Sequence, residues 1–475
     1  MKRGRRYGLV ASVAGALCLF SGLSGVGFAS PAGGVRGDPQ PELTPFSLGT
    51  LASTSTAAIA MEPNGSMVVA YDVPAGSGKL LVCVLDRGLR RCASKTVLNL
   101  PSGQSPYGPP GVFIPSANHV FAFQGESPGA EALYSSTDGG KVFGRPVQVG
   151  SYPDTLSVSA SALVGSHIVF IADDNGGGAQ IESISLASPG SSPITTLTTK
   201  TAYDVAVGNY RDGALVGSDY DGAAFTSTYA WYAPAGSNFN ATSSYTQFGP
   251  FGKEMLLGIS GDALLTVQTA GSKFMLLRIF NGRGFGPAHV VPGGTGCIIG
   301  CSITVDEDPG GAVHVFIERS EFDYDLIERT TTSGGKNWDA AVNLGDAISD
   351  GGFAAALDSR GAGLVIGTGN VLAYPVLAAQ GVSFGIKPSG IRQGKSATGS
   401  GKISPAGAGR VVTLQVERSG RWYSVATTHS RSGGSFSFTI RGGSAGTFDY
   451  RAVASDLAGY LMYGYSNSQS LHVTG

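Results

Sequence analysis

The sequence predicts an all-β fold, a seven-bladed β-propeller followed by a smaller β-sandwich. Short strands rich in Val, Ile, Leu and Phe recur about every 50 residues, each directly after a turn. A repeat of this length built from short strands is typical of propeller blades. The chain also holds 73 glycines and only 14% charged residues. This composition suits many tight turns, because glycine adopts the positive φ that they need.

The repeating strand occurs seven times and sets the boundaries of the propeller. Its copies begin at Gly65, Asn118, Ser166, Gly213, Gly261, Gly311 and Gly361. Four strands fit into each period, so residues 41–388 are predicted to form the propeller. Segment 42–49 has the pattern of an outer strand. We expect it to pair into the last blade, because this closes the ring and leaves no edge strand exposed.

Residues 1–29 have the pattern of a secretory signal peptide. A basic start and an apolar stretch over 9–20 precede the small residues Gly27 and Ala29. A membrane anchor is the alternative, but the apolar run is short and interrupted. We therefore expect a secreted, extracellular protein with no membrane span after signal cleavage. Residues 30–40 are rich in Gly and Pro and are predicted to be a flexible entry segment.

The charge balance argues against nucleic acid as a partner. Residues 1–29 contain four of the 32 Lys+Arg and none of the 33 Asp+Glu, so the remaining chain carries a net charge of −5. A nucleic-acid-binding protein needs a basic footprint.

Four cysteines follow the signal segment: Cys83, Cys92, Cys297 and Cys301. An even number in an extracellular chain indicates disulfides, and three pairings are open. The local pairing, Cys83 with Cys92 and Cys297 with Cys301, is favoured because the first two flank a hairpin turn. Zinc is the alternative, although no histidine lies near the second pair in sequence.

Two turns between third and fourth strands carry the pattern S/T-x-D-x-G-x-x-W/F. The second unit fills it with Ser136, Asp138, Gly140 and Phe143, and the sixth with Thr331, Gly335 and Trp338, where Ser333 replaces the aspartate. These turns resemble the Asp-box (BNR) repeat of sialidase-like propellers. The resemblance implies a structural role, in which the carboxylate accepts turn N–H groups and the aromatic ring packs between blades. Weaker matches place Phe239, Phe285 and Phe384 at the same turn of the fourth, fifth and seventh units.

The resemblance raises the alternative of an exo-sialidase-like glycoside hydrolase. That chemistry needs an arginine cluster for the substrate carboxylate and a tyrosine nucleophile with a glutamate partner. The family's early F/Y-R-I-P motif is absent, and no arginine lies between Arg36 and Arg87. No catalytic residue is therefore assigned. Hydrolysis by two carboxylates of the acidic loops remains open.

The loops joining second to third strands share one face of a propeller, and here they are acidic. They carry the candidate ligand-binding residues Asp173, Asp174, Asp219, Tyr220, Asp221, Glu318, Asp323, Tyr324 and Asp325. Either these are ordinary solvated side chains, or they form a negative rim that attracts a cation. The pairs Asp219/Asp221 and Asp323/Asp325 would suit Ca²⁺, and the two tyrosines would stack on sugar rings. Residues near the starts of inner strands extend this list: Asp154, Asp204, Glu254 and Asp350.

Residues 389–475 have a different pattern of strands and turns. About seven alternating strands separated by Gly/Ser turns predict a β-sandwich, with Trp422 and Tyr450 in or near its core. The pattern from G-x-I-x-P through G-R-W to Y-R-A resembles bacterial immunoglobulin-like (Ig-like) modules of secreted actinobacterial proteins. The resemblance implies a spacer or a binding unit.

These features predict a monomeric, non-catalytic propeller that binds an extracellular glycan or protein through loops on a rigid ring. The alternatives are a divergent sialidase-like glycoside hydrolase and an extracytoplasmic assembly or stability factor. The sequence contains no H-E-x-x-H, G-x-S-x-G or P-loop motif. No cofactor is expected other than Ca²⁺.

Overall fold

The structure is a computed structural model that describes most of the chain beyond residue 44. The described residues are 45–48, 57–72, 78–86, 91–101, 105–106, 108–127, 130–149, 157–173, 179–189, 195–196, 202–220, 227–268, 274–293, 302–318, 325–346, 352–367, 371–378, 380–456 and 461–475. The predicted signal peptide and entry segment lie outside them. Within the described residues, no helix is both long and apolar enough to cross a bilayer.

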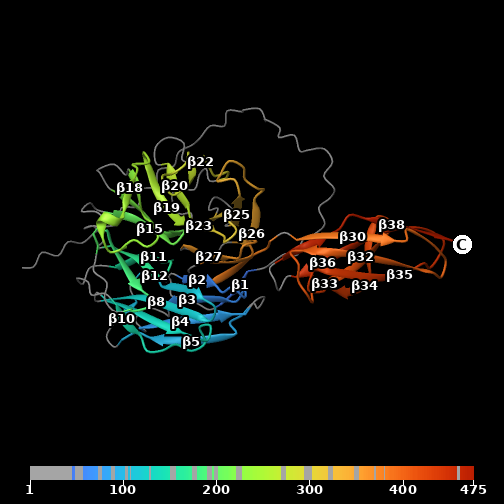
Figure 1. The fold of residues 1–475 in the computed structure, drawn as a ribbon, viewed down its shortest axis with the longest axis horizontal. Coiled ribbons are helices and arrows are strands. Elements are labelled where there is room, and N and C mark those ends of the chain that lie inside the picture. Colours follow the sequence, from blue (N-terminus) through green and yellow to red (C-terminus); the bar gives the residue numbers. More distant parts are fainter. Residues whose placement is uncertain are drawn as a thin grey trace, which may run out of the picture. The chain divides into compact units, whose positions relative to one another are not determined.

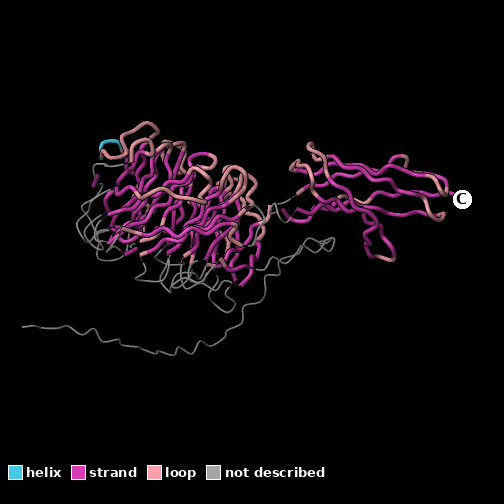
Figure 2. The backbone as a smooth tube through the Cα atoms, turned by 90° about the horizontal axis from the view of Figure 1, so that it is seen from below, coloured by secondary structure: helices cyan, strands magenta, loops and turns pink. Residues whose placement is uncertain are grey.

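The fold is all-β, as predicted (Figure 2). The helical content of the described residues is one 3-10 turn, Thr242–Ser244. Residues 46–376 form seven antiparallel sheets, six of four strands and one of five. In five of the sheets each strand pairs with the next one in sequence; in the second sheet β6 and β7 both pair with β8, and in the seventh β1 pairs with β29.

The first three sheets have the following strands. The first contains β2 (Ala57–Met61), β3 (Met67–Asp72), β4 (Lys79–Leu85) and β5 (Ser94–Asn99). The second contains β6 (Ser105–Pro106), β7 (Gly111–Ser116), β8 (His119–Ser127), β9 (Ala130–Ser136) and β10 (Val147–Val149). The third contains β11 (Ser157–Val164), β12 (His167–Asp173), β13 (Ala179–Ser185) and β14 (Thr195–Thr196).

The next four sheets repeat this order. The fourth contains β15 (Ala202–Tyr210), β16 (Gly213–Tyr220), β17 (Ser227–Ala233) and β18 (Thr246–Phe248). The fifth contains β19 (Glu254–Ser260), β20 (Ala263–Gln268), β21 (Met275–Ile279) and β22 (His289–Val290). The sixth contains β23 (Ile303–Glu307), β24 (Val313–Glu318), β25 (Asp325–Thr331) and β26 (Val342–Asp346). The seventh contains β27 (Phe353–Leu357), β28 (Gly363–Gly367), β29 (Leu372–Val376) and β1 (Phe46–Ser47).

One strand from each of the seven sheets lies beside its counterpart in the next sheet, in a closed circuit (Figure 1). This is the first strand of each sheet, except in the second sheet, where β7 takes this place. Contacts run from β2 through β7, β11, β15, β19 and β23 to β27, which contacts β2 again. Apolar cores lie between neighbouring sheets, so the second strands are covered on both faces. All six residues of β24, for example, are buried, which explains why these strands are apolar runs rather than alternating ones. The arrangement is consistent with a β-propeller.

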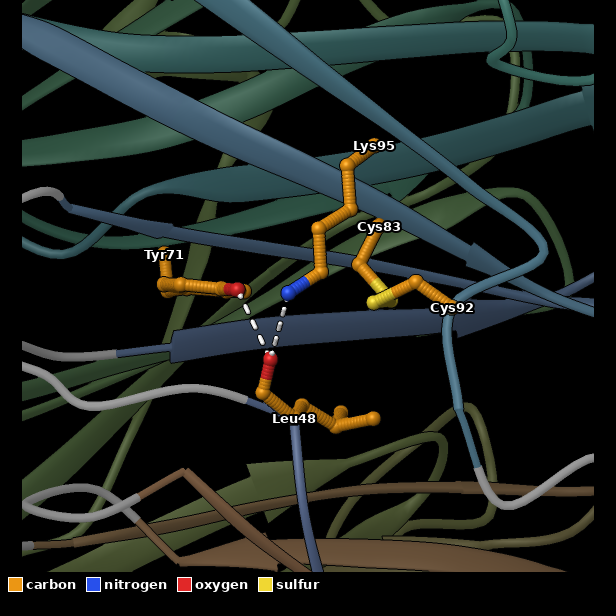
Figure 3. The surroundings of a disulfide bond; sticks show 5 residues. All are labelled: Leu48, Tyr71, Cys83, Cys92 and Lys95. Atoms are coloured by element: carbon orange, nitrogen blue, oxygen red, sulfur yellow. Dashed lines mark hydrogen bonds between the residues drawn. A yellow bond between two sulfur atoms is a disulfide. The ribbon is translucent and has the colours of Figure 1, made fainter.

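The segment that precedes the first sheet joins the last one, which confirms the predicted pairing of the chain's early strand. Phe46 pairs with Ala373, and Ser47 with Leu372. Leu48 then links the two sheets: its N–H donates to the carbonyl of Val371 at 3.0 Å. Its own carbonyl accepts from the Tyr71 hydroxyl at 3.2 Å and from the Lys95 ammonium at 3.1 Å (Figure 3).

A disulfide joins Cys83 on β4 to Cys92, ahead of β5, with Cα atoms 5.4 Å apart. This confirms the predicted local pairing for these two residues. Cys83 is buried in the core shared by the first and seventh sheets, which also contains Leu48. The disulfide therefore stands beside the residue that links the last sheet to the first (Figure 3). Cys297 and Cys301 lie outside the described residues, and their pairing stays a prediction.

Residues 381–475, called the C-terminal module below, form two further sheets. The three-stranded sheet contains β30 (Gly381–Lys387), β32 (Ser396–Ser404) and β35 (Ser435–Arg441). The six-stranded sheet contains β31 (Gly390–Arg392), β33 (Val411–Arg418), β34 (Arg421–His429), β36 (Gly446–Asp456), β37 (Leu461–Tyr465) and β38 (Gln469–Thr474). Both sheets contribute to one core around Phe436, Phe438 and Leu414.

The structure corrects one assignment near the start of this module. Phe384, expected at a turn of the seventh unit, lies instead in β30 and pairs with Gly401 of β32. Its ring stacks on Phe436. The alternation Val382, Phe384, Ile386 is that of a strand with one buried face, which the resemblance to the turn motif obscured. Tyr450 packs against the module's core, whereas Trp422 lies outside it.

Candidate functional site

The predicted ligand-binding residues lie where second strands end and third strands begin. Asp219 and Glu318 are near or at the ends of β16 and β24, and Asp325 begins β25. The side chains of these three residues are described. Asp174, Asp221, Asp323 and Tyr324 lie outside the described residues, as do the side chains of Asp173 and Tyr220.

The repeat places polar side chains at equivalent positions on this face. In each sheet a residue with positive φ closes the turn before the second strand, including Gly65, Asp212, Gly261 and Gly311. Seven residues after these four stand, respectively, Asp72, Asp219, Gln268 and Glu318. Asp219 and Glu318 are only 6% and 3% exposed. They are therefore not the solvated loop carboxylates that one alternative expected.

Asp219 is held between the fourth and fifth sheets. Its Oδ1 accepts the Thr228 hydroxyl at 2.6 Å, and its Oδ2 accepts the backbone N–H of Leu256 at 2.6 Å. Burial raises the pKa of Asp219 to about 6, although these two hydrogen bonds oppose the rise. The charges of Asp204 and Glu254 raise it further. A carboxyl group tuned this way changes charge just below neutral pH.

Glu254 lies next to Asp219 and is paired with an arginine. Arg278 of β21 donates from Nη1 to Oε2 at 2.5 Å and from Nη2 to Oε1 at 2.7 Å. The Thr266 hydroxyl donates to the same Oε2 at 2.6 Å. The side chains of Arg278 and Glu254 are 11% and 8% exposed, so this is a buried bidentate ion pair. The guanidinium carbon also lies 5.1 Å from the centre of the Phe251 ring.

Arg278 was not among the sequence-predicted site residues. The available signal was a lone arginine within the otherwise apolar strand Met275–Ile279. A buried cation at such a position needs a carboxylate, and the carboxylate comes from the first strand of the same sheet, 24 positions earlier.

Two carboxylates and an arginine thus lie close together, but their hydrogen-bonding groups are already bound by partners within the protein. Both oxygens of Glu254 face Arg278, and both oxygens of Asp219 accept protein donors. A glycosidase needs one carboxyl group free to protonate a leaving group and another free to attack or to activate water. In its present form this cluster fixes the ends of β16, β19 and β21 relative to one another.

A second buried polar cluster surrounds His314 of β24. Its Nδ1 lies 2.7 Å from Glu328 Oε1, and its Nε2 lies 3.3 Å from Asp308 Oδ2. Burial lowers the histidine pKa, but the two carboxylates outweigh this and raise it to about 9. The imidazole is therefore charged at neutral pH and donates from both nitrogens. Gly361 lies against the ring, because a Cβ there would approach Cε1 to 2.6 Å.

The turns that carry the Asp-box pattern hold themselves by side-chain hydrogen bonds. In the second sheet, Asp138 Oδ1 accepts the N–H groups of Lys141 and Val142, both at 3.0 Å, and the Ser136 hydroxyl at 2.7 Å. The Ser136 oxygen in turn accepts the N–H of Gly140 at 3.0 Å. Phe143 packs against the core between the first and second sheets. These hydrogen bonds occupy the Ser136 hydroxyl and the Asp138 Oδ1 atom within the turn itself, as a structural role requires.

The sixth sheet uses a variant of this turn. The Thr331 hydroxyl accepts the N–H of Gly335 at 3.0 Å, as Ser136 does for Gly140. Ser333, which replaces the aspartate, accepts the N–H of Asn337 at 2.8 Å. Trp338 packs against the core between the fifth and sixth sheets. At the matching turns, Phe239 is buried and Phe285 is partly buried among aromatic rings.

Within the described part of the chain, no three His, Cys, Asp or Glu residues are grouped as metal ligands.

No family model matches the chain, and no curated protein matches it. Solved structures similar to it include an ulvan lyase, described as a polysaccharide lyase bound to -[GlcA(1-4)Rha3S]-. This structure is 11% identical with a TM-score of 0.43, covering 72% of this chain and 96% of that chain. An Aleuria aurantia lectin variant bound to Fucα1-6GlcNAc is 12% identical with a TM-score of 0.36, covering 80% and 97%. NanB with Optactamide is 9% identical with a TM-score of 0.28, covering 57% and 54%. At these values, similarity carries no inference about what this chain binds.

Proposed function

We propose that the protein is a secreted seven-bladed β-propeller with a C-terminal Ig-like module, and that it binds an extracellular glycan or protein without catalysis. The seven sheets are the blades. Binding would occur on the face where second strands lead into third strands. The closed circuit of first strands supports this proposal, since a rigid ring presents loops at low entropic cost. A disulfide in the first blade supports an extracellular location.

The observation that carries the proposal is that Asp219, Glu254 and Arg278 are all bound within the protein: Glu254 and Arg278 pair with each other, and both oxygens of Asp219 accept protein donors. Their polar atoms bind protein partners, so the cluster supports the adjoining loops rather than presenting an acid and a base. A binding protein needs this arrangement, because affinity rises when loops are held in place before the ligand arrives. The tyrosines and carboxylates of those loops would then make the contacts with the ligand.

A divergent sialidase-like glycoside hydrolase is the second candidate, and one observation favours it. The raised pKa of Asp219 is what a general acid near neutral pH requires. In that case Asp219 would exchange its hydrogen bond from Leu256 for one to the substrate.

A glycan array and parallel hydrolysis assays separate the two candidates. The chain from Ser30 onward should bind a restricted set of glycans, or an extracellular protein, and release no sugar product. An Asp219→Asn variant is isosteric and keeps one acceptor oxygen, so it should bind with similar affinity. Product release that disappears in this variant would establish the hydrolase instead.

The proposal includes a Ca²⁺ ion bound by Asp323 and Asp325. The oxygens of Asp219 already accept protein donors, which makes the pair Asp219/Asp221 the poorer fit. Melting curves in calcium and in EDTA test this. Calcium should raise the melting temperature of the chain, and an Asp325→Asn variant should reduce that rise. Identical curves would remove calcium from the proposal.

A further inference from the structure

The C-terminal module differs sharply in charge from the rest of the chain. Residues 381–475 contain ten Lys+Arg and three Asp+Glu, a net charge of +7. Residues 30–380 contain 18 Lys+Arg and 30 Asp+Glu, a net charge of −12. The nearly neutral total therefore conceals a basic module, and asymmetry of this kind indicates a polyanionic partner.

Most of the positive charge of the module faces solvent. Eight basic side chains are exposed: Lys387, Arg392, Lys395, Lys402, Arg418, Arg421, Arg431 and Arg441. Across the described residues, the ion pairs that the structure contains lie in the propeller sheets and none involves these eight. Their charge is therefore not neutralised within the module.

One face of the six-stranded sheet combines this charge with aromatic rings. Trp422 of β34 and Tyr465 of β37 stand on either side of Arg451 of β36, whose guanidinium carbon lies 4.3 Å and 4.7 Å from the two ring centres. Arg451 Nε donates to Gln415 Oε1 of β33 at 2.8 Å. These four residues come from four adjacent strands, in the order β34, β33, β36 and β37. They form a continuous platform, called the aromatic–arginine platform below.

The β33–β34 turn adds two exposed arginines beside the platform. Arg418 and Arg421 are directly opposite each other in the hairpin, and Trp422 follows immediately. Like charges at opposed positions destabilise a hairpin, so the fold itself does not favour this pair. Two adjacent guanidinium groups are instead well suited to a carboxylate or sulfate group. Two acidic residues lie at this end of the platform: Glu417, opposite Trp422, and Asp449, two residues before Arg451 on β36.

We propose that the aromatic–arginine platform and the Arg418/Arg421 turn bind an anionic polysaccharide. Sugar rings would stack on the ring faces of the partly exposed Trp422 and Tyr465 that Arg451 does not cover, while the exposed Arg418 and Arg421 bind the anionic groups. Arg451 is only 9% exposed and holds the two rings in place. The predicted signal peptide and the disulfide favour a polysaccharide over nucleic acid as the polyanion. This site is built from residues of the C-terminal module alone and shares none with the propeller loops, so the proposal does not rest on the proposed function.

Binding of the chain from Ser30 onward to immobilised polygalacturonate, dextran sulfate and neutral dextran tests the proposal. We expect binding to one or both charged polymers, weakening with salt, and none to neutral dextran. Polygalacturonate carries carboxylates and dextran sulfate carries sulfates. Comparing binding to the two polymers therefore identifies which anionic group the protein recognises.

An Arg418→Gln/Arg421→Gln variant should bind about tenfold more weakly, because two charge contacts are lost. A Trp422→Ala variant should also weaken binding. The matched control is Arg145→Gln/Arg283→Gln, which removes two exposed charges from the propeller and should bind within about twofold of the parent. The hairpin variant leaves the core intact, and an unchanged melting curve would verify this.

Three results would overturn the proposal. Equal weakening by the control variant would mean that net charge, rather than this surface, drives binding. Stronger binding to a DNA duplex than to either charged polymer would identify nucleic acid as the partner. Salt-dependent self-association without polymer binding would mean that the basic module docks on the acidic propeller of a second copy.

Discussion

At the scale of single residues, buried ion pairs are the groups whose removal should most affect the stability of the protein. Arg278 and Glu254 form a bidentate pair that is almost fully buried, and His314 lies between two carboxylates. Removing one partner of such a pair costs more than removing both, since a single charge is then left without compensation.

Arg278→Ala should therefore lower the free energy of unfolding by about 3–5 kcal/mol. Glu254→Gln/Arg278→Met, which removes both charges, should recover much of this loss. Urea unfolding of the three proteins measures the difference. A loss below about 1 kcal/mol for the single variant would mean that Glu254 is hydrated rather than buried.

His314 should make stability depend on pH above neutrality. Its pKa of about 9 in the folded protein exceeds the value of about 6.5 expected when unfolded. The stabilisation is thus complete below pH 6.5 and disappears as the pH rises through 9. Burial raises the pKa of Asp306 to about 7. Its contribution to stability is therefore also lost as the pH rises, but at a lower pH than that of His314.

Unfolding measured from pH 7 to pH 10 should show this loss in the parent, on the order of 2 kcal/mol. A His314→Gln variant should be less stable at pH 7 and nearly insensitive to pH over that range. If both proteins follow the same curve, another group is responsible for the titration.

At the scale of elements, the third-to-fourth-strand turns show how one motif tolerates substitution. The Asp138 carboxylate accepts two backbone N–H groups, whereas the Ser333 hydroxyl accepts one. Both turns keep the hydroxyl that binds the glycine N–H and the aromatic ring that packs between sheets. The hydroxyl, glycine and ring are therefore the parts of the motif that these two turns share.

Ser333→Asp should stabilise the sixth sheet by about 0.5–1.5 kcal/mol, because a carboxylate can accept a further turn N–H group. Ser333→Ala is the matched control and should be destabilising. Thermal unfolding of both variants checks the prediction. A destabilising aspartate would mean that the surroundings of this turn do not accommodate the charge.

The sequence predicted elements better than side-chain clusters. The period located the second strand of each sheet because those strands are covered on both faces and thus read as apolar runs. The early strand was also predictable, since a ring without it would have an open edge. The Glu254–Arg278 pair was not, because its partners are 24 positions apart on different strands. The cluster around His314 was not predictable either, since its carboxylates come from a turn and from the third strand.

At the scale of the whole molecule, Leu48 and the disulfide occupy the junction of the last and first sheets. Leu48 is 3% exposed and shares a core with Cys83. Its carbonyl is bound by Tyr71 and Lys95, both in the first sheet. The disulfide restrains the connection between β4 and β5, and Lys95 is the second residue of β5.

Cys83→Ala/Cys92→Ala should lower the free energy of unfolding by about 2.5 kcal/mol, the loop entropy expected for so short a bridge. Leu48→Ala should cost about 2–5 kcal/mol. Because the two sites share one core, their effects should not add. Strict additivity in the triple variant would show that the disulfide and the closing strand act independently.

The pairing of Phe46 with Ala373 also sets an order of events in time. The chain is synthesised from its N-terminus, so within the seven sheets β1 is made before all the other strands and its partner β29 is made last. For that interval β1 has an unpaired edge, and it can complete a sheet only after more than 300 further residues have emerged. Such a long-range pairing slows folding, and until it forms the unpaired edge of β1 is open to aggregation with other strands. Because β1 is only two residues long, its edge offers few backbone hydrogen bonds to a wrong partner before β29 is synthesised.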